Sequence, residues 1–140
     1  MAVYSQIPNT IKGRRLLLEK ELQKYSYKKV YCPALSRKVR IHPDSITETA
    51  YHASKSVLST KLALRIKYII EHAKLIQTGI TPKCGTQTRK FHFKELVVLL
   101  CGIRGLGTAK LTVGYVYKRL VIEYCITDIK METRNPATQS

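Results

Sequence analysis

The sequence predicts an α+β fold in which N-terminal helices are followed by an antiparallel meander of about four strands. Apolar residues recur at helical spacing in the first half of the chain, whereas they alternate with a period of two after Gly79. This change of period places the helices before the strands. A chain of 140 residues, of which 44% are hydrophobic, is long enough to bury a core as one globular domain.

Residues 1–38 are predicted to form a basic N-terminal helix and an arm. Ile11, Leu18 and Leu22 follow one side of a short amphipathic helix, and its outer side is basic. The segment after this helix is rich in tyrosine and lysine and is interrupted by Pro33. Such a segment is expected to be an arm or an edge strand.

Residues 39–130 are predicted to form the core domain, which opens with a short strand and two helices. The strand stops at Pro43, and Ser45 and Glu48 then form a capping-box pattern at the start of the first helix. The second helix is expected over residues 61–78. The apolar stripes of the two helices comprise Ile46, Ala50, Ala53 and Val57, and Leu62, Ile66, Ile69, Ala73 and Ile76.

Three further strands are predicted after the helices. They cover residues 91–99, 109–117 and about 120–127. The glycine-rich segment over residues 102–107 is expected to be a flexible connection between the first two of them. Residues 131–140 are polar and are predicted to be a flexible tail.

The net charge is the strongest indication of function. Twenty-five Lys and Arg against nine Asp and Glu give a formal net charge of +16. The excess is +8 over residues 1–40, +2 over 41–80 and +6 over 81–140, which predicts a basic surface assembled in three dimensions. Such a surface attracts a polyanion, because counterions are released from the phosphates on binding. We expect RNA or DNA as the partner, RNA before DNA, with an acidic protein as the alternative.

Nothing in the sequence indicates export, a membrane span or a metal site. The N-terminus lacks the apolar run of a signal peptide, and no apolar stretch is long enough to cross a bilayer. Cys32, Cys84, Cys101 and Cys125 are too far apart for the usual spacing of zinc ligands. These features predict a cytoplasmic protein with reduced thiols, no membrane partner, no metal and no cofactor.

Metal-free cleavage of RNA is the reaction that the remaining residues fit. The sequence has no Walker loop and no clustered carboxylates of a two-metal nuclease. Cleavage without a metal needs proton transfer and cations beside the phosphate. His52 is predicted to share a polar helix face with Lys55 and Ser56, and Tyr117 or Tyr124 would orient the substrate. The alternative is a solvated polar helix face without catalytic function.

A second group of residues is predicted to bind nucleic acid. Aromatic rings beside cations can stack on bases and hold phosphates, although tyrosine is also an ordinary strand former. The predicted binding residues are Lys110, Tyr115, Tyr117, Lys118 and Arg119 in the meander, with Arg14 and Arg15 on the N-terminal helix.

Three segments resemble a domain found in large polyvalent proteins of phages and conjugative elements. They are VRIHPDSITETAYHASKS, IIEHAKLIQTG and TAKLTVGYVYKRLVIEYCIT, within residues 39–127. The order of elements is also similar to the barnase–EndoU–colicin–RelE nuclease fold. The resemblance implies a metal-independent ribonuclease or an inactive relative, and only His52 and the polar residues of the last strands match. Position 56 is Ser, whereas better-known relatives have a His-x-x-x-His helix.

The sequence therefore leads to three hypotheses. The chain is a metal-independent endoribonuclease of toxin or mobile-element type, with His52, Lys55 and Tyr124 at its active site. Alternatively it is a non-catalytic module that binds RNA or DNA through the same basic surface. A third possibility is an accessory protein that docks an acidic partner.

Overall fold

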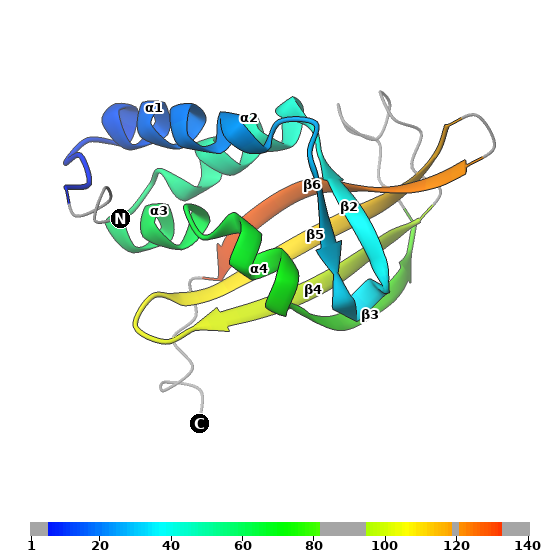
Figure 1. Cartoon of the computed structure of the whole chain (residues 1–140). Helices are drawn as coiled ribbons and strands as arrows, with labels where there is room; N and C mark the ends of the chain where they lie inside the picture. Colours follow the sequence, from blue (N-terminus) through cyan, green and yellow to red (C-terminus); the bar gives the residue numbers. More distant parts are fainter. Residues whose placement is uncertain (1–5, 82–94, 119–120, 133–140) are drawn as a thin grey trace.

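The computed structural model of the protein describes residues 6–81, 95–118 and 121–132 (Figure 1). For residues 116–118, 121–128 and 130–132 it describes the backbone only. The predicted α+β class is confirmed, since helices pack against one six-stranded sheet of order β1-β2-β6-β5-β4-β3. About four strands were expected. The two additional strands are β1 (Lys29–Cys32), in the N-terminal segment, and β3 (Lys74–Ile80), in a segment predicted to be mostly helical.

Helix α1 spans Ile11–Leu22 and begins at Thr10, whose side chain accepts a hydrogen bond from the Gly13 amide. Leu18 and Leu22 are fully buried, as the sequence predicts, but Ile11 is 54% exposed. The third buried residue of the helix is Arg14, one turn before Leu18. The inward stripe therefore follows the spacing i, i+4, i+8 from an arginine. A short 3-10 turn, η1 (Gln23–Tyr25), follows the helix.

The segment that could be an arm or an edge strand forms a β-hairpin. Strand β1 (Lys29–Cys32) pairs antiparallel with β2 (Arg37–Ile41) around the 3-10 turn η2 (Pro33–Leu35). Strand β2 pairs on its other side with β6 (Val121–Glu132), and this pairing is parallel. The hairpin thus adds β1 to one edge of the sheet, and β1 belongs to the same sheet as the C-terminal strands.

Helix α2 spans Pro43–Ala53 and is capped by His42, three residues before the predicted cap Ser45. The His42 imidazole accepts a hydrogen bond from the Asp44 amide, and Pro43 occupies the first turn, where no amide donor is needed. The predicted capping box is wrong, because Ser45 is buried inside the first turn. The apolar stripe of Ile46, Ala50 and Ala53 is confirmed, as all three are fully buried.

The helix predicted over residues 61–78 is wrong as a single element. Helix α3 (Val57–Ala63) and helix α4 (Ile66–His72) are separated by a break at Arg65, and strand β3 (Lys74–Ile80) follows. The predicted stripe is buried through Ala73, beyond which the backbone is extended and Ile76 is 55% exposed. Strand β3 forms its backbone hydrogen bonds with β4. The spacing of apolar residues within the segment does not reveal this partner. The position predicted for Val57 in the stripe of α2 is also wrong, since Val57 opens α3 and is exposed.

The last three strands form a meander with β3. Strand β4 (Leu96–Ile103) pairs with β5 (Gly107–Lys118), which pairs with β6 (Val121–Glu132), all antiparallel. The glycine-rich segment is a three-residue hairpin turn, in which the Leu106 amide donates to the Ile103 carbonyl oxygen. Gly105 and Gly107 have positive φ there, which explains why glycine is required. The predicted strand residues 91–94 lie outside the described part of the chain.

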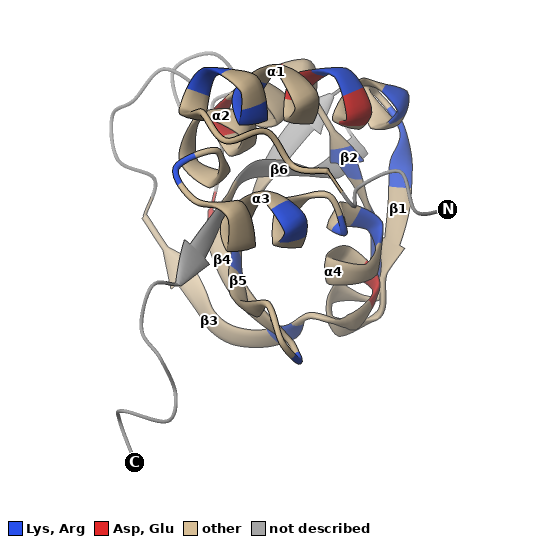
Figure 2. Ribbon diagram, turned by 90° about the vertical axis from the view of Figure 1, so that its left-hand side faces the viewer, with Lys and Arg blue, Asp and Glu red and all other residues tan. Residues whose placement is uncertain are grey.

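The core lies between the helices and one face of the sheet. Ile46 and Ala50 of α2, Leu62 of α3 and Ile69 of α4 pack into one apolar cluster with Leu111 of β5. In Figure 2 the sheet curves around α4, and α1 lies beside α2. Helix α2 in turn packs on β6. Among the described helices, none is long and apolar enough to cross a membrane.

Candidate nucleic-acid interface

The structure brings three of the predicted site residues together around a tyrosine that the sequence analysis did not select. Tyr51 of α2 is 47% exposed. The Arg15 guanidinium lies 5.3 Å from the centroid of its ring, and the Lys55 ammonium lies 4.8 Å from it. The His52 ring meets the same ring edge-on, with centroids 5.3 Å apart. We call these four residues the Tyr51 cluster.

Two carboxylates accompany the Tyr51 cluster, Glu19 beside Arg15 and Glu48 beside His52. His52 Nε2 lies 3.5 Å from Glu48 Oε2, one turn earlier on α2. This contact orients the imidazole, whose side chain is 27% exposed. The expectation that Lys55 and Ser56 extend the same helix face is wrong, because α2 ends at Ala53 and Ser56 caps α3. Lys55 reaches the cluster from the connection between the two helices.

Arg14 does not belong to the surface. Its side chain is buried, with 7% of the residue exposed. Its Nε donates to the Ser54 carbonyl oxygen at 2.7 Å, and its guanidinium also donates to the Pro8 carbonyl oxygen at 3.1 Å. The predicted phosphate contact of Arg14 is therefore replaced by a structural role, because its donors already satisfy two backbone carbonyls.

The predicted binding residues of the meander lie apart from the Tyr51 cluster. Lys110 alternates with the fully buried Ala109 and Leu111, so it lies on the face of the sheet opposite the helices. Tyr115 packs against the core. The backbone places Tyr124 of β6 in register with Tyr115 and with Val39 of β2.

The remaining predicted residues are placed only in part. Tyr117 and Lys118 lie at the end of β5, paired with Ile122 and Val121. Their side chains, like that of Tyr124, are outside the described part of the structure. Arg119 lies outside the described residues altogether.

A second basic surface lies on the β1–β2 hairpin, and the sequence analysis missed it. Val30 and Cys32 of β1, and Val39 and Ile41 of β2, point into the core. The alternate residues therefore share the outer face. They form two cross-strand pairs, Lys29 with Arg40 and Tyr31 with Lys38. We call these four residues the hairpin face.

The sequence around the hairpin face is rich in cations. Between Glu21 and Asp44 the chain contains six Lys and Arg and no acidic residue. Lys29 and Lys38 are exposed, and Tyr31 is 51% exposed. Figure 2 shows the resulting positive segments on β1 and β2, in addition to those on α1. The signal that could have revealed this surface is the spacing of two residues between Lys29 and Tyr31 and between Lys38 and Arg40. On a strand, this spacing places both members of each pair on the same face.

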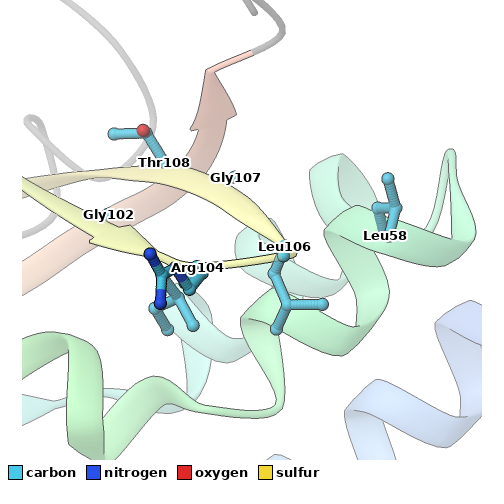
Figure 3. Close-up of a pocket in the computed structure, with 8 residues that line it drawn as sticks. Leu58, Gly102, Arg104, Leu106, Gly107 and Thr108 are labelled. Carbon is cyan, nitrogen blue, oxygen red and sulfur yellow. The ribbon is translucent and has the colours of Figure 1, made fainter. Parts of the chain in front are cut away.

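A cavity of about 440 Å³ lies beside the turn between β4 and β5 (Figure 3). Leu58 of α3 lies on one side, and the turn that carries Arg104 and Leu106 lies on the other. The eight lining residues include no carboxylate, imidazole or thiol. The cavity therefore lacks groups suited to proton transfer near neutral pH.

The described thiols differ from those of nucleophilic cysteines, which are accessible and have a lowered pKa. Cys32 and Cys101 are free and buried. Burial raises the pKa of both thiols, because the thiolate loses its solvation. Within residues 6–81, 95–118 and 121–132, no group of three or more His, Cys, Asp and Glu is arranged to hold a metal ion.

No family model matches this sequence, and no curated protein or solved structure matches it either. Function is therefore inferred from the two basic surfaces, the Tyr51 cluster and the hairpin face.

Proposed function

We propose that this protein binds nucleic acid through the hairpin face. The observation that carries the proposal is the pairing of three cations with an exposed tyrosine, on a segment without acidic residues. Cations neutralise phosphates, and the release of counterions contributes the larger share of affinity at low salt. The overall charge of +16 adds long-range attraction for the same polyanion.

The proposal is tested by charge reversal on the hairpin. The variant Lys29→Glu/Lys38→Glu is expected to weaken binding of a labelled oligonucleotide by roughly tenfold or more at 50 mM salt. It should also reduce the slope of log affinity against log salt by roughly 0.7 for each lost contact with a single strand. Fluorescence anisotropy at several salt concentrations measures both quantities.

A control variant separates the hairpin from the net charge. Lys12→Glu/Lys74→Glu changes two exposed lysines, one on α1 and one on β3. Both double variants lower the formal net charge from +16 to +12. A much smaller loss in the control supports the hairpin as the interface. Equal losses would assign the binding to net charge alone and overturn the proposal.

Metal-independent cleavage of RNA at the Tyr51 cluster is the second candidate function. The arrangement that favours it is a partly exposed imidazole oriented by Glu48, with Lys55 and Arg15 at the adjacent Tyr51 ring. In this reaction the 2′-oxygen attacks the phosphorus and the 5′-oxygen leaves, which gives a cyclic phosphate and a 5′-hydroxyl. His52 takes the proton from the 2′-hydroxyl, and a water molecule gives a proton to the leaving 5′-oxygen. The resemblance to mobile-element nuclease domains supports the same activity.

Cleavage is tested with labelled RNA in excess EDTA. His52→Ala and Lys55→Ala are each expected to slow the reaction at least about 100-fold if they act in proton transfer and charge stabilisation. His72→Ala is the matched control, because His72 also lies on a helix and stacks on a tyrosine, with ring centroids 3.9 Å apart. Full activity in His52→Ala, or no cleavage by the unmodified protein, would exclude this active site and leave a binding module.

A further inference from the structure

We infer that the hairpin face binds single-stranded nucleic acid, with bases stacked on Tyr31 and on the neighbouring Tyr27. The inference rests on the proposed function and specifies its substrate class. It adds an aromatic component to the phosphate contacts, and this component selects strands with accessible bases.

The ring of Tyr31 is available for stacking. Its residue is 51% exposed, and within the described part of the structure its ring contacts no other ring and its hydroxyl makes no hydrogen bond. An exposed tyrosine on a strand next to cations can accept the face of a base. The Tyr51 ring differs, because Arg15 and Lys55 already lie within 5.3 Å of its centroid.

Tyr27 extends the arrangement by one step along the hairpin. Its amide donates to the Ile41 carbonyl oxygen at 2.7 Å, and its ring meets the His42 ring with centroids 5.3 Å apart. The pair of Tyr27 and His42 therefore follows the pair of Lys29 and Arg40. Tyr27 is 61% exposed. From the turn before β1 into the strand, the exposed residues therefore include Tyr27, Lys29 and Tyr31 in this order.

The spacing of these residues suits an extended chain of nucleotides. Lys29 and Tyr31 are two residues apart on β1 and are therefore separated by roughly 6.5–7 Å along the strand, and Tyr27 lies in the turn just before β1. Lys29 lies between the two tyrosines, and Arg40 and Lys38 lie across from Lys29 and Tyr31. Rings and cations thus alternate in the way that bases and phosphates alternate along a single strand.

The rings distinguish single strands from duplexes. In a duplex each base face is covered by its neighbours in the stack, so a side chain on the outside meets phosphates and groove edges. In a single strand the bases can turn out and stack on an aromatic side chain. An acidic protein would satisfy the lysines but would not require the tyrosine rings to be accessible.

The decisive experiment uses tryptophan as a reporter of stacking. The chain contains no tryptophan, so Tyr31→Trp introduces the only indole emission. Titration with an unlabelled single-stranded oligonucleotide is expected to quench this emission as a base stacks on the indole. The same sequence as a duplex should bind more weakly and leave the emission nearly unchanged. Quenching by both forms, or by neither, would overturn the inference.

Affinity measurements with Tyr31→Ala and Tyr31→Phe complete the test. Loss of the ring is expected to weaken single-strand binding roughly 5- to 100-fold, while phenylalanine keeps the affinity. The salt slope should stay unchanged in both, because tyrosine releases no counterion from a phosphate. If the protein binds nucleic acid but Tyr31→Ala has no effect, stacking is wrong and the proposed function stands. If an acidic protein binds the hairpin face and no oligonucleotide does, both the stacking and the proposed function are wrong.

Discussion

Arg14 connects the N-terminal helix to the end of α2 through two backbone carbonyls. Its Nε donates to Ser54 and its guanidinium donates to Pro8, and the side chain is buried against the core. Arg14→Ala removes these bonds and leaves the Ser54 carbonyl short of a donor. We expect a loss of roughly 2–4 kcal/mol in the free energy of unfolding, since bonds to a charged donor are among the stronger ones. Urea denaturation followed by circular dichroism measures it.

Arg15 is the natural control for this prediction. It is the next residue, its side chain is 44% exposed, and it forms an ion pair of 3.8 Å with Glu19. Because exposed pairs contribute little, Arg15→Ala should change stability by under about 0.5 kcal/mol. Equal stability of the two variants would contradict the structural role of Arg14.

These adjacent arginines show what the sequence could reveal at the scale of single residues. Both were predicted to contact nucleic acid, since both were placed on the basic outer face of an amphipathic helix. The spacing of Arg14 from Leu18 and Leu22 is four and eight residues, which indicates the inward face. The expectation that an arginine faces solvent concealed this signal, because only the tertiary structure supplies the two carbonyls that allow its burial.

At the scale of elements, the junction between α2 and α3 is fixed by hydroxyl groups. Thr60 Oγ1 donates to the Ala53 carbonyl oxygen at 3.0 Å and contacts the Ser56 carbonyl oxygen at 2.8 Å. Ser59 Oγ also donates to Ala53. These bonds satisfy the end of α2 while α3 turns away, and Ser56 caps the new helix.

Replacement of Thr60 by valine tests this junction. Valine fills nearly the same volume but has no hydroxyl, so Thr60→Val should lower the free energy of unfolding by roughly 1–2 kcal/mol. Thr47→Val is the matched control, because Thr47 is exposed and its hydroxyl also donates to a carbonyl four residues back, at 3.3 Å. Thr47→Val should lower the free energy of unfolding by under about 0.5 kcal/mol. Thermal unfolding of both variants measures the difference, and similar values would rule out the hydroxyls as the determinant.

The elements also show where local periodicity ceases to determine structure. The stripe from Leu62 to Ala73 predicted helix and is buried as expected, with only a break at Arg65. The helical pattern continues to Ile76, yet this residue lies in β3. The choice between helix and strand there depends on pairing with β4, about twenty residues later in the chain. A pattern within one segment contains no information about that partner.

At the scale of the whole molecule, the predicted α+β class was correct because it depends on the order of the two periods. The parallel pairing of β2 with β6 joins residues that are 85 positions apart, such as Val39 and Tyr124. The hairpin face depends on this sheet, because its outer side exists only when Val39 and Ile41 are buried against the core. The Tyr51 cluster was predicted in part, since His52, Lys55 and Arg15 were chosen from their chemistry. The central Tyr51 was missed, because it becomes central only when α1 packs on α2.

The N-terminal segment is expected to be an integral part of the fold. Leu18, Leu22 and Val30 are almost fully buried, and their burial contributes roughly 5–9 kcal/mol, which is comparable with the total stability of a small domain. A variant that lacks residues 1–32 also exposes the edge of β2. We expect it to show no cooperative transition in urea. Of the tail predicted over residues 131–140, residues 131–132 belong to β6, and deletion of residues 133–140 should leave the transition midpoint unchanged. A cooperative transition in the variant that lacks residues 1–32 would mean that the fold does not require α1 and β1. The hairpin face would then be a detachable arm rather than part of the sheet.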